Sequence, residues 1–393
     1  MKILILTSEL APLHAGGIAT YTSTIAPALA QRGHTVHVLS CAEDHARQDT
    51  DRDGVTWHTR PLLANAVARL HRAPEATLRL RSMASSLAWL RRAHERFDVI
   101  ETPDWMALGF LIQLARSAPI VVHVHSPIGL LTNYNRIQWT KDRRVSDWFE
   151  RSMTHRAQAV TTVSKLMAST LSSSGWLRTE PELIRYPIDV GSVEVSWPAG
   201  DAERNILFVG RLEFTKAPEL LLEAASLLRE RGTSFRLTFV GRSNGSREGL
   251  PYIDYLQGMA KASDLDVTFI EWLSPSDLRK LYADARVVAV PSRFDSFSIV
   301  ALEAMAAARP VVCTSNTGAA EVIGQTGAGT VVPPDDPVSL AEALLPFLDD
   351  PNRATAAGAA ARDSVAASCD APLVAAMREA CFSRAIARWH GPK

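Results

Sequence analysis

The feature that most constrains the fold of this chain is a regular alternation of short β-branched runs with longer segments rich in Ala and Leu. Residues 2–8 (KILILTS) and 34–40 (HTVHVLS) have the pattern of buried strands, and residues 18–33 between them have that of a helix ending in glycine. Further strands are expected at residues 98–102, 119–125 and 159–164. Strands that alternate with helices in this way predict a parallel, doubly wound sheet.

The alternation starts again after a stretch at residues 186–203 that contains Pro and Ser. Residues 205–211 (NILFVGR) open this second half as a strand, and a helical segment follows at 218–232. Four more strands are expected, at residues 235–241, 266–272, 286–292 and 310–315. The pattern therefore predicts two halves of the same architecture.

The length of 393 residues allows each half to bury a core of its own. We expect an α/β fold of two Rossmann-like domains, residues 1–190 and 191–370, that face a cleft between them. The last segment, residues 371–393, begins with an amphipathic helical pattern. It either packs back on the N-terminal domain or serves as an ordinary C-terminal cap helix.

The composition indicates a globular protein without a strong electrostatic preference for one partner. Lys plus Arg and Asp plus Glu are both 42, so net charge does not attract nucleic acid. The four cysteines form no CxxC spacing, which fits a reducing compartment and argues against structural zinc. The apolar start of the chain is too short for a signal peptide, and no run approaches the roughly 20 apolar residues of a membrane span. We expect a cytoplasmic protein with no nucleic-acid partner.

Candidate ligand-binding residues directly follow predicted strands, where open α/β sheets bind their ligands. Gly16 and Gly17 follow the first strand and open a helix, so the backbone there can approach an anion, although a plain tight turn is the more common reason for such a pair. Arg211 and Lys216 follow the first strand of the second half, where two cations can clamp a diphosphate. Two solvated loop cations are the alternative. The glycine pair is not GxGxxG, which disfavours a dinucleotide-dependent dehydrogenase.

The segment PSRFDSFSIVALEA at residues 291–304 places Asp295 before an apolar helix and Glu303 inside it. The N–H groups at the start of this helix form a site for phosphate oxygens. The residues that supply them are Phe297, Ser298, Ile299 and Val300. Glu303 lies about two turns further on, where its carboxylate can accept hydrogen bonds from a vicinal diol such as a ribose. A helix-surface role is the alternative, but the apolar neighbours of Glu303 leave little polar surface.

In this order, the motifs resemble the retaining GT-B-fold glycosyltransferases of family four. That family has a glycine pair after the first strand, GR…K at the start of the C-terminal domain, and PS…E-x7-E running into EAMA and PVV. This chain has GG at 16–17, VGRLEFTK at 209–216, PSRFDSFSIVALEAMAAARPVV at 291–312 and TGAAEVI at 317–323. The resemblance covers nearly the whole chain.

The resemblance implies transfer of a sugar, with retention of anomeric configuration, from a nucleoside diphosphate sugar to a hydroxyl acceptor. A UDP-sugar is favoured over guanosine or thymidine donors, and neither a metal nor a cofactor is implied. The product would belong to polysaccharide, glycolipid or secondary-metabolite biosynthesis. The implied donor contacts are Arg211, Lys216 and Gly17 for the diphosphate, the amides of residues 297–300 for phosphate, Glu303 for the ribose, Asp295 for sugar hydroxyls, and the backbone near Ile270 and Trp272 for the base.

His125 in VVHVHSP matches the family's strand-end histidine and is implied to lie beside the donor sugar at the reaction centre. His123 shares its strand face, so a metal-binding pair and a structural histidine are alternatives. Glu101 and Asp104 also follow a strand, and they are further candidates for contact with the acceptor.

The chain departs from the family pattern at three places. Asp295 stands where the family usually has Glu, Ser298 stands where it usually has Gly, and the linker reads IRYPID instead of a proline and Asn-Gly before the Asp. These changes leave two rival functions open: a GT-B-fold sugar-nucleotide epimerase and a non-catalytic sugar-nucleotide-binding protein. The Arg-rich residues 68–97 are also a candidate for peripheral binding to the inner face of the membrane. A solvated helix face is the alternative.

Overall fold

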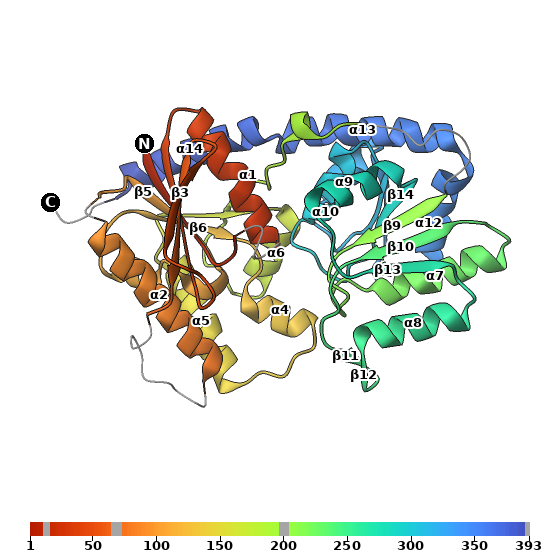
Figure 1. Cartoon of the computed structure of the whole chain (residues 1–393), viewed down its shortest axis with the longest axis horizontal. Helices are drawn as coiled ribbons and strands as arrows, with labels where there is room; N and C mark the ends of the chain where they lie inside the picture. Colours follow the sequence, from red (N-terminus) through yellow and green to blue (C-terminus); the bar gives the residue numbers. More distant parts are fainter. Residues whose placement is uncertain (11–15, 64–72, 94, 196–203, 390–393) are drawn as a thin grey trace. The chain divides into compact units, whose positions relative to one another are not determined.

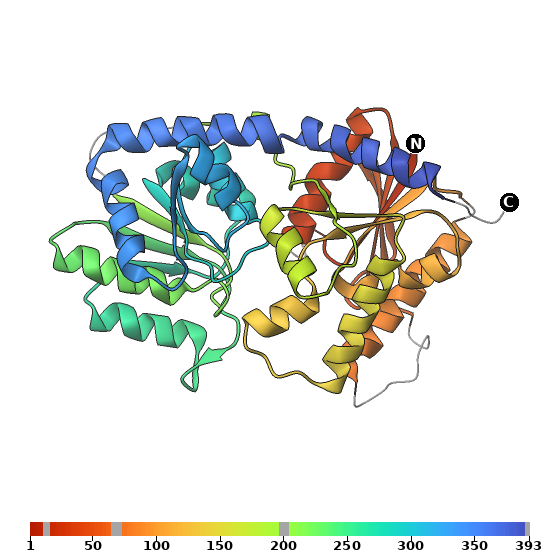
Figure 2. The same ribbon diagram turned by 180° about the vertical axis from the view of Figure 1, so that it is seen from behind.

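The computed structural model describes residues 1–10, 16–63, 73–93, 95–195 and 204–389. These residues divide into two compact units, which Figures 1 and 2 show from opposite sides. The first unit comprises Met1–Pro187 together with Ala371–Lys393, and the second comprises Ile188–Asp370. The chain therefore passes from one unit to the other after Pro187 and returns after Asp370.

The sheet of the first unit has the strand order β3-β4-β2-β1-β5-β6-β7-β8 in the described residues. Its strands are β1 (Lys2–Thr7), β2 (Thr35–Ala42), β3 (Gln48–Arg52), β4 (Val55–Pro61), β5 (Val99–Pro103), β6 (Ile120–Val124), β7 (Ala159–Thr162) and β8 (Glu182–Leu183). Neighbouring strands are parallel except for β3 and β4, which form an antiparallel hairpin. The central strands are buried apolar runs, as expected of a parallel sheet covered on both faces.

Helices connect these strands and pack in two groups. They are α1 (Gly17–Gln31), α2 (Pro74–Arg92), α3 (Phe110–Leu114), α4 (Ile128–Tyr134), α5 (Lys141–His155), α6 (Lys165–Ser173) and α14 (Ala371–Ala387), with a short 3-10 turn at Trp105–Ala107. Helix α14 packs against α1 and the strands β5, β6 and β7, whereas α2 packs against α5 and α3. Arg378 anchors α14, because its fully buried guanidinium pairs with Glu101 (3.4 Å) and donates to Thr161 (2.8 Å).

The second unit contains a parallel sheet with the order β13-β10-β9-β14-β15-β16 in the described residues. These strands are β9 (Asn205–Val209), β10 (Arg236–Val240), β13 (Val267–Ile270), β14 (Val287–Val290), β15 (Val311–Thr314) and β16 (Gly329–Val332), and β11 (Ser246–Arg247) with β12 (Leu250–Pro251) forms a separate hairpin. The helices are α7 (Pro218–Glu230), α8 (Tyr252–Ala262), α9 (Pro275–Asp284), α10 (Ile299–Ala306), α11 (Ala320–Thr326), α12 (Pro337–Asp349) and α13 (Pro351–Cys369), with a 3-10 turn at Val190–Ser192. The predicted α/β class with two Rossmann-like halves is confirmed.

The β3–β4 hairpin is an element that the strand pattern did not predict. Residues 48–52 (QDTDR) are polar and exposed, so they carry no hydrophobic alternation. The local signal is the Asp53-Gly54 pair between the two strands, where both residues have positive φ (55° and 75°). Asp-Gly is a preferred sequence for a two-residue hairpin turn. Among the described residues, none of the helices combines the length and the apolar character needed to cross a bilayer.

Candidate functional site

Lys216 and Asp295, predicted from motifs 79 residues apart, meet in the second unit. Lys216 follows β9 and Asp295 follows β14, and these two strands are neighbours in the sheet. Lys216 Nζ lies 2.6 Å from Asp295 Oδ2, with side chains 23% and 12% exposed. Because both strands run in the same direction, their carboxyl ends deliver the two side chains to one edge of the sheet. The sequence prediction did not include this direct contact.

Arg211 lies in the same loop after β9 and has a different partner. Its guanidinium pairs with Glu213 (3.0 Å) and its side chain is 54% exposed. Glu213 is almost fully buried and also accepts a hydrogen bond from Asn244 (2.9 Å). Glu213 was not predicted as a site residue, because an acid two positions after an arginine is an unremarkable loop pattern. The pair leaves Arg211 oriented but open to solvent.

The backbone of the GR motif closely approaches a second glycine at this strand end. Gly210 has φ +151°, and Gly241, which directly follows the neighbouring strand β10, also has φ +151°. A Cβ atom on Gly241 would lie 1.9 Å from the carbonyl oxygen of Gly210. The two backbones therefore approach too closely for any side chain at position 241.

Arg293 ties the Lys216 loop to the Asp295 loop. Its backbone N–H donates to the carbonyl of Thr215 (2.8 Å), and its guanidinium lies over the ring of Phe214 (4.0 Å to the centroid). The same guanidinium pairs with Glu219 (2.7 Å) and with Asp335 (2.6 Å). These contacts hold the two loops together, so Arg293 positions Lys216 and Asp295.

The helix α10 begins where the sequence predicted, but Ser298 is its strained N-cap. Ser298 has φ +79° and ψ +95°, and its Oγ accepts a hydrogen bond from the N–H of Ala301 (3.3 Å). The side chain of Phe297 is fully buried, so this residue contributes to the core. The N–H groups of Ile299 and Val300 belong to the first turn, which has no intrahelical acceptors for them. They are the donors of this helix that fit an anion.

Glu303 lies inside α10 and is held by Tyr282 of α9. The Tyr282 hydroxyl donates to Glu303 Oε2 over 2.7 Å. Burial raises the pKa of Glu303, and the hydrogen bond from Tyr282 opposes that effect. The bond engages one carboxylate oxygen and fixes the orientation of the other. Tyr282 was not predicted, because its role depends on a tertiary contact between two helices.

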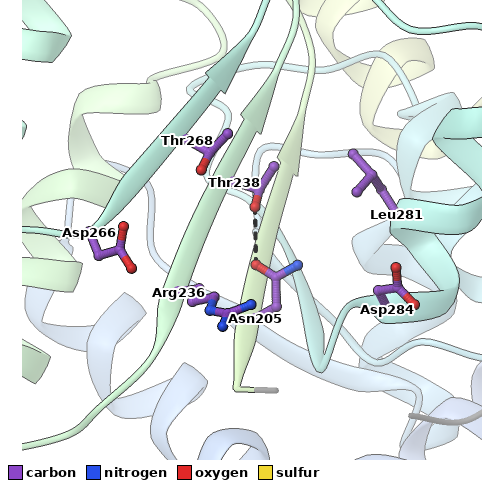
Figure 3. A pocket seen from close by; sticks show the side chains of 7 residues that line it. All are labelled: Asn205, Arg236, Thr238, Asp266, Thr268, Leu281 and Asp284. Carbon is purple, nitrogen blue, oxygen red and sulfur yellow. Dashed lines mark hydrogen bonds between the residues drawn. The ribbon is translucent and has the colours of Figure 1, made fainter. Parts of the chain in front are cut away.

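Ile270 and Trp272 also lie at the carboxyl edge of the second sheet. Ile270 ends β13, and its carbonyl accepts a hydrogen bond from Gly241 N–H (2.8 Å). Trp272 follows, and its side chain is 55% exposed. By contrast, a pocket of about 450 Å³ lies toward the amino ends of β9, β10 and β13, away from the predicted residues (Figure 3). It is lined by Asn205, Arg236, Thr238, Asp266, Thr268, Leu281 and Asp284.

His125 directly follows β6 in the first unit and is buried. Its N–H donates to Asp104 Oδ1 (2.7 Å), and its ring Nδ1 lies 2.8 Å from the Tyr186 hydroxyl. The two rings stack, with centroids 5.4 Å apart and an interplanar angle of 23°. Burial, with a smaller contribution from the Arg378 cation, lowers the pKa of His125 to about 3, so the ring is neutral. Tyr186 belongs to the departing linker motif IRYPID and was not predicted as a partner of this histidine.

The neighbouring His123 is a buried residue of the same strand. Its Nδ1 lies 2.8 Å from Thr161 Oγ1, and burial keeps its pKa well below the ordinary value. Among the described residues, no group of three or more His, Cys, Asp or Glu side chains is arranged to hold a metal ion.

Glu101 and Asp104 are both buried within the first unit, so they are not placed to bind an acceptor directly. Glu101 accepts a hydrogen bond from Tyr21 (2.5 Å) and pairs with Arg378. Burial raises the pKa of Asp104 to about 7. Burial also raises the pKa of Glu150 to about 8, and the negative charge of Asp104 adds to this effect. Arg79, 3.3 Å from Glu150, supplies one balancing cation, so one carboxyl of the pair retains a proton near neutral pH.

The glycine pair lies at the start of α1. Gly16 is the N-cap residue in an extended conformation (φ −90°, ψ 173°), and its carbonyl accepts the N–H of Thr20 (3.1 Å). Gly17 is exposed and opens the helix. A Cβ atom on Gly16 would lie 2.1 Å from the carboxylate of Glu9. Residues 11–15, which precede the glycine pair in the sequence, lie outside the described residues.

Comparison with known proteins agrees with this arrangement. The profile described as Glycosyl transferases group 1 matches residues 194–364, and that described as Glycosyl transferase 4-like domain matches residues 16–187. The chain therefore belongs to the GT-B glycosyltransferases of family four, and it is a glycosyltransferase.

Individual relatives match over most of their length. An uncharacterized glycosyltransferase of Methanocaldococcus jannaschii is 29% identical over 368 residues, covering 89% of this chain and 90% of the relative. The structure of a sucrose-phosphate synthase from Thermosynechococcus elongatus has a TM-score of 0.81 at 21% identity and covers 99% of this chain and 100% of that one. Anabaena HepE in complex with UDP-glucose has a TM-score of 0.72 at 17% identity, covering 98% and 99%.

Proposed function

We propose that this glycosyltransferase uses a nucleoside diphosphate sugar, with a UDP-sugar favoured, and transfers the sugar to a hydroxyl acceptor with retention of configuration. The observation that carries the proposal is the Lys216–Asp295 contact of 2.6 Å at the edge of the sheet where α10 begins. A cation, a carboxylate and helix amides gathered there suit the diphosphate and the sugar hydroxyls of such a donor. The complex of Anabaena HepE with UDP-glucose supports the choice of donor class.

The cations would act on the leaving group. As the bond between the sugar C1 and the phosphate oxygen breaks, negative charge develops on the nucleoside diphosphate. Lys216, Arg211 and the first amides of α10 stabilise this charge, and their positions are fixed before the reaction. Because the loops are already tied together through Arg293, little reorganisation is needed when the charge appears.

Retention follows if the acceptor attacks from the face that the diphosphate leaves. The acceptor oxygen forms the new bond to C1, and its proton passes to an oxygen of the departing phosphate. No protein nucleophile and no metal are required in this route. The neutral ring of His125 can donate or accept one hydrogen bond at Nε2. In this proposal it forms that hydrogen bond with a hydroxyl of the donor sugar.

Asp295 has two successive partners in this proposal. Without donor it neutralises Lys216 across 2.6 Å. When the diphosphate binds, it draws Lys216 toward its oxygens, and the Asp295 carboxylate becomes available to accept hydrogen bonds from the sugar. The carboxylate of Glu303, oriented by Tyr282, would bind the ribose hydroxyls with its second oxygen.

Replacement of Lys216 tests the proposal. Lys216→Ala should lower kcat/KM by about 100-fold or more, since it removes a preorganised charge from the leaving group. Lys280→Ala is the matched control, because Lys280 forms an exposed pair with Asp277 in the same unit. The measurement is product formation from a panel of nucleoside diphosphate sugars and hydroxyl acceptors. Near-normal turnover in Lys216→Ala would refute the diphosphate clamp.

The same assay separates the proposal from its rivals. Donor incubated without acceptor should remain unchanged apart from slow hydrolysis, as followed by NMR of the sugar C1 proton. Inversion of a sugar carbon under these conditions would establish an epimerase. Donor binding, seen as a higher melting temperature, without transfer to any acceptor would establish a binding protein.

A further inference from the structure

Helix α5 separates its charges between an inner and an outer side. We define its outer face by the residues that point away from the unit. These are Lys141, Arg144, Val145, Trp148, Arg151 and His155. Trp148 is 54% exposed and Val145 is 43% exposed, so two apolar side chains protrude from this face. Every charged group on this face is a cation or a histidine.

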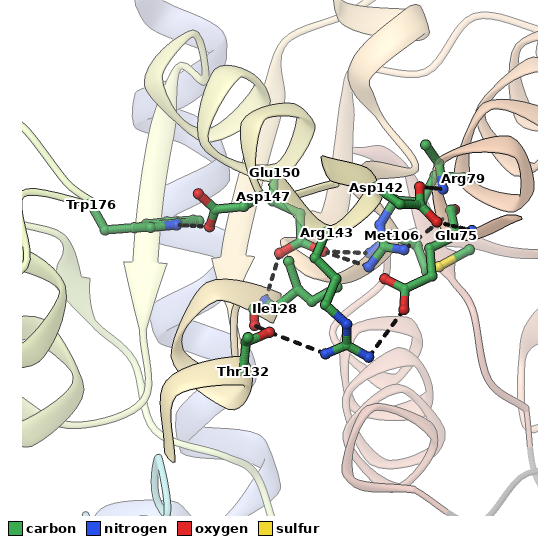
Figure 4. A network of polar contacts seen from close by, with 11 residues as sticks. Glu75, Arg79, Met106, Ile128, Thr132, Asp142, Arg143, Asp147, Glu150 and Trp176 are labelled. Atoms are coloured by element: carbon green, nitrogen blue, oxygen red, sulfur yellow. Dashed lines mark hydrogen bonds and ion pairs between the residues drawn. The ribbon is translucent and has the colours of Figure 1, made fainter. Parts of the chain in front are cut away.

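Two of the three acidic residues of α5 are turned inward and engaged there (Figure 4). Asp142 accepts the N–H groups of Glu75 and Ala76 at the start of α2, each over 2.8 Å. Glu150 accepts the N–H groups of Met106 (3.3 Å) and Ile128 (2.8 Å), and it pairs with Arg79. Both carboxylates therefore serve the interior and lend no negative charge to the outer face.

The third acid, Asp147, lies on the flank of the helix. Its side chain is 15% exposed, accepts a hydrogen bond from the Trp176 indole N–H (3.1 Å) and pairs with Arg151 (3.0 Å). Asp147 therefore offsets the positive charge of Arg151 at the edge of the outer face. It does not offset the charges of Lys141 and Arg144. The Arg144 guanidinium lies 5.9 Å from the centroid of the Trp139 ring.

Exposed apolar side chains also occur in segments that precede or contact the helix. Ile137, in the loop before α5, is 43% exposed. Leu114 of α3 is 54% exposed, and Phe110 on the same helix lies 5.9 Å from the Trp148 ring. The surface thus combines protruding apolar groups with cations that have long, flexible stems.

We propose that the outer face of α5 docks on an anionic phospholipid bilayer. Lysine and arginine side chains can reach lipid phosphates while Trp148, Val145 and Ile137 lie at the depth of the interface, where aromatic and aliphatic groups are stabilised. We choose an anionic bilayer as the partner because of charge complementarity. Cationic side chains around apolar groups are attracted to an anionic lipid surface more strongly than to a zwitterionic one. The face is about 22 Å long, from 15 residues at 1.5 Å each, which suits a helix that lies along the surface.

The Arg-rich helix α2, which the sequence suggested for this role, is less suitable. Arg79 is 3% exposed and pairs with Glu150, and Arg81 pairs with Glu43. The exposed cations at its C-terminal end are Arg91 and Arg92. Of the predicted segment 68–97, residues 68–72 and 94 lie outside the described residues. The two helices thus offer a direct comparison within one protein.

Sedimentation of the full-length protein with vesicles tests the proposal. The probes are vesicles of phosphatidylcholine alone and vesicles in which about a third of the lipid is phosphatidylglycerol. The protein should bind the anionic vesicles at low salt, should be released by high salt and should not bind the zwitterionic ones. Lys141→Glu/Arg144→Glu should bind at least about 20-fold more weakly, because each cation contributes about a factor of five near an anionic surface.

The matched control makes the same charge change on α2. Arg91→Glu/Arg92→Glu should bind within about twofold of the wild type, and Trp148→Ser should bind more weakly while remaining sensitive to salt. No binding at low salt would overturn the proposal, as would equal losses in both charge-reversed variants. Loss in the α2 variant alone would move the site to α2. Donor-induced thermal shifts, expected to be unchanged in the α5 variants, keep this result separate from the test of sugar transfer.

Discussion

Ser298 is strained at the N-cap of α10, and relieving that strain should stabilise the protein. Its φ of +79° lies in the region that favours glycine, which is the residue that the family pattern has at this position. Its Oγ caps the helix through Ala301 N–H at 3.3 Å, a long hydrogen bond. Ser298→Gly removes both the strain and the cap, whereas Ser298→Ala removes only the cap.

The two effects can be compared in magnitude. A non-glycine residue held in such a conformation costs about 1–3 kcal/mol. Replacing an N-cap serine by glycine costs only a few tenths of a kcal/mol, and replacing it by alanine costs about 1 kcal/mol. Ser298→Gly should therefore be more stable than the wild type by about 1–2 kcal/mol, whereas Ser298→Ala should be less stable by about 1 kcal/mol. For a unit of this size, the glycine variant should melt about 2–8 °C higher.

Ser274 is the matched control, because it caps α9 with an ordinary φ of −64° and accepts the N–H of Asp277 (3.1 Å). Ser274→Gly should be slightly less stable than the wild type, since it loses a cap without relieving strain. Thermal and urea unfolding of the three variants and the wild type would measure the differences. If Ser298→Gly is no more stable than the wild type, the strain argument is wrong. The glycine variant should also lower the donor KM, because Oγ no longer occupies the amide of Ala301.

Three further predictions concern the first unit. Because burial raises the folded-state pKa of Asp104, the contribution of this residue to stability should be fully present below the ordinary carboxyl pKa and be lost as pH rises toward about 7, at up to roughly 1 kcal/mol per pH unit; urea unfolding of Asp104→Asn should lack this component of the pH dependence across that range. Arg378→Met should destabilise the protein by about 3–5 kcal/mol in thermal unfolding, since it leaves the buried carboxylate of Glu101 without its cation. Arg384→Met on the same helix removes only an exposed pair with Glu182 and should destabilise by less than about 1 kcal/mol in that assay. Tyr186→Phe keeps the ring beside His125 but removes the hydroxyl; steady-state kinetics should show kcat lower by about fivefold with KM little changed, and an unchanged kcat would show that the hydroxyl does not orient His125.

The fold was largely predictable because parallel strands are buried on both faces. Such strands form continuous apolar runs, as in VVAV of β14, which stand out from amphipathic helices in a single sequence. The hairpin β3–β4 escaped prediction because an exposed edge strand needs no apolar residues. Only its Asp53-Gly54 turn carried a signal.

The candidate site was predictable where a motif places residues directly after strands, and not where a contact depends on tertiary packing. Lys216 and Asp295 follow adjacent strands and meet. Glu213, Tyr282 and Tyr186 are the partners that orient Arg211, Glu303 and His125. Tyr282 and Tyr186 lie outside the motifs of their partners, and Glu213 lies within VGRLEFTK as an ordinary acidic loop residue. Ordinary residue types become informative only when the fold brings them within hydrogen-bonding distance.

The carboxylate partners of Lys216 and Arg211 explain how a chain with no net charge holds two cations on the loop after β9. In the described structure Lys216 is paired with Asp295 and Arg211 with Glu213, so the cations are held in place by carboxylates before any donor arrives. An isolated cluster of cations would repel itself and spread its side chains into solvent. In the proposed reaction the diphosphate takes over the contacts that the carboxylates make beforehand. The electrostatic repulsion between the cations is therefore already offset in the folded protein before the donor binds. The same pairing sets a limit on affinity, because each carboxylate competes with the donor for its cation. Asp295→Asn should therefore bind the free nucleoside diphosphate more tightly than the wild type while transferring sugar more slowly, since the carboxylate that weakens product binding is also the one that contacts the sugar.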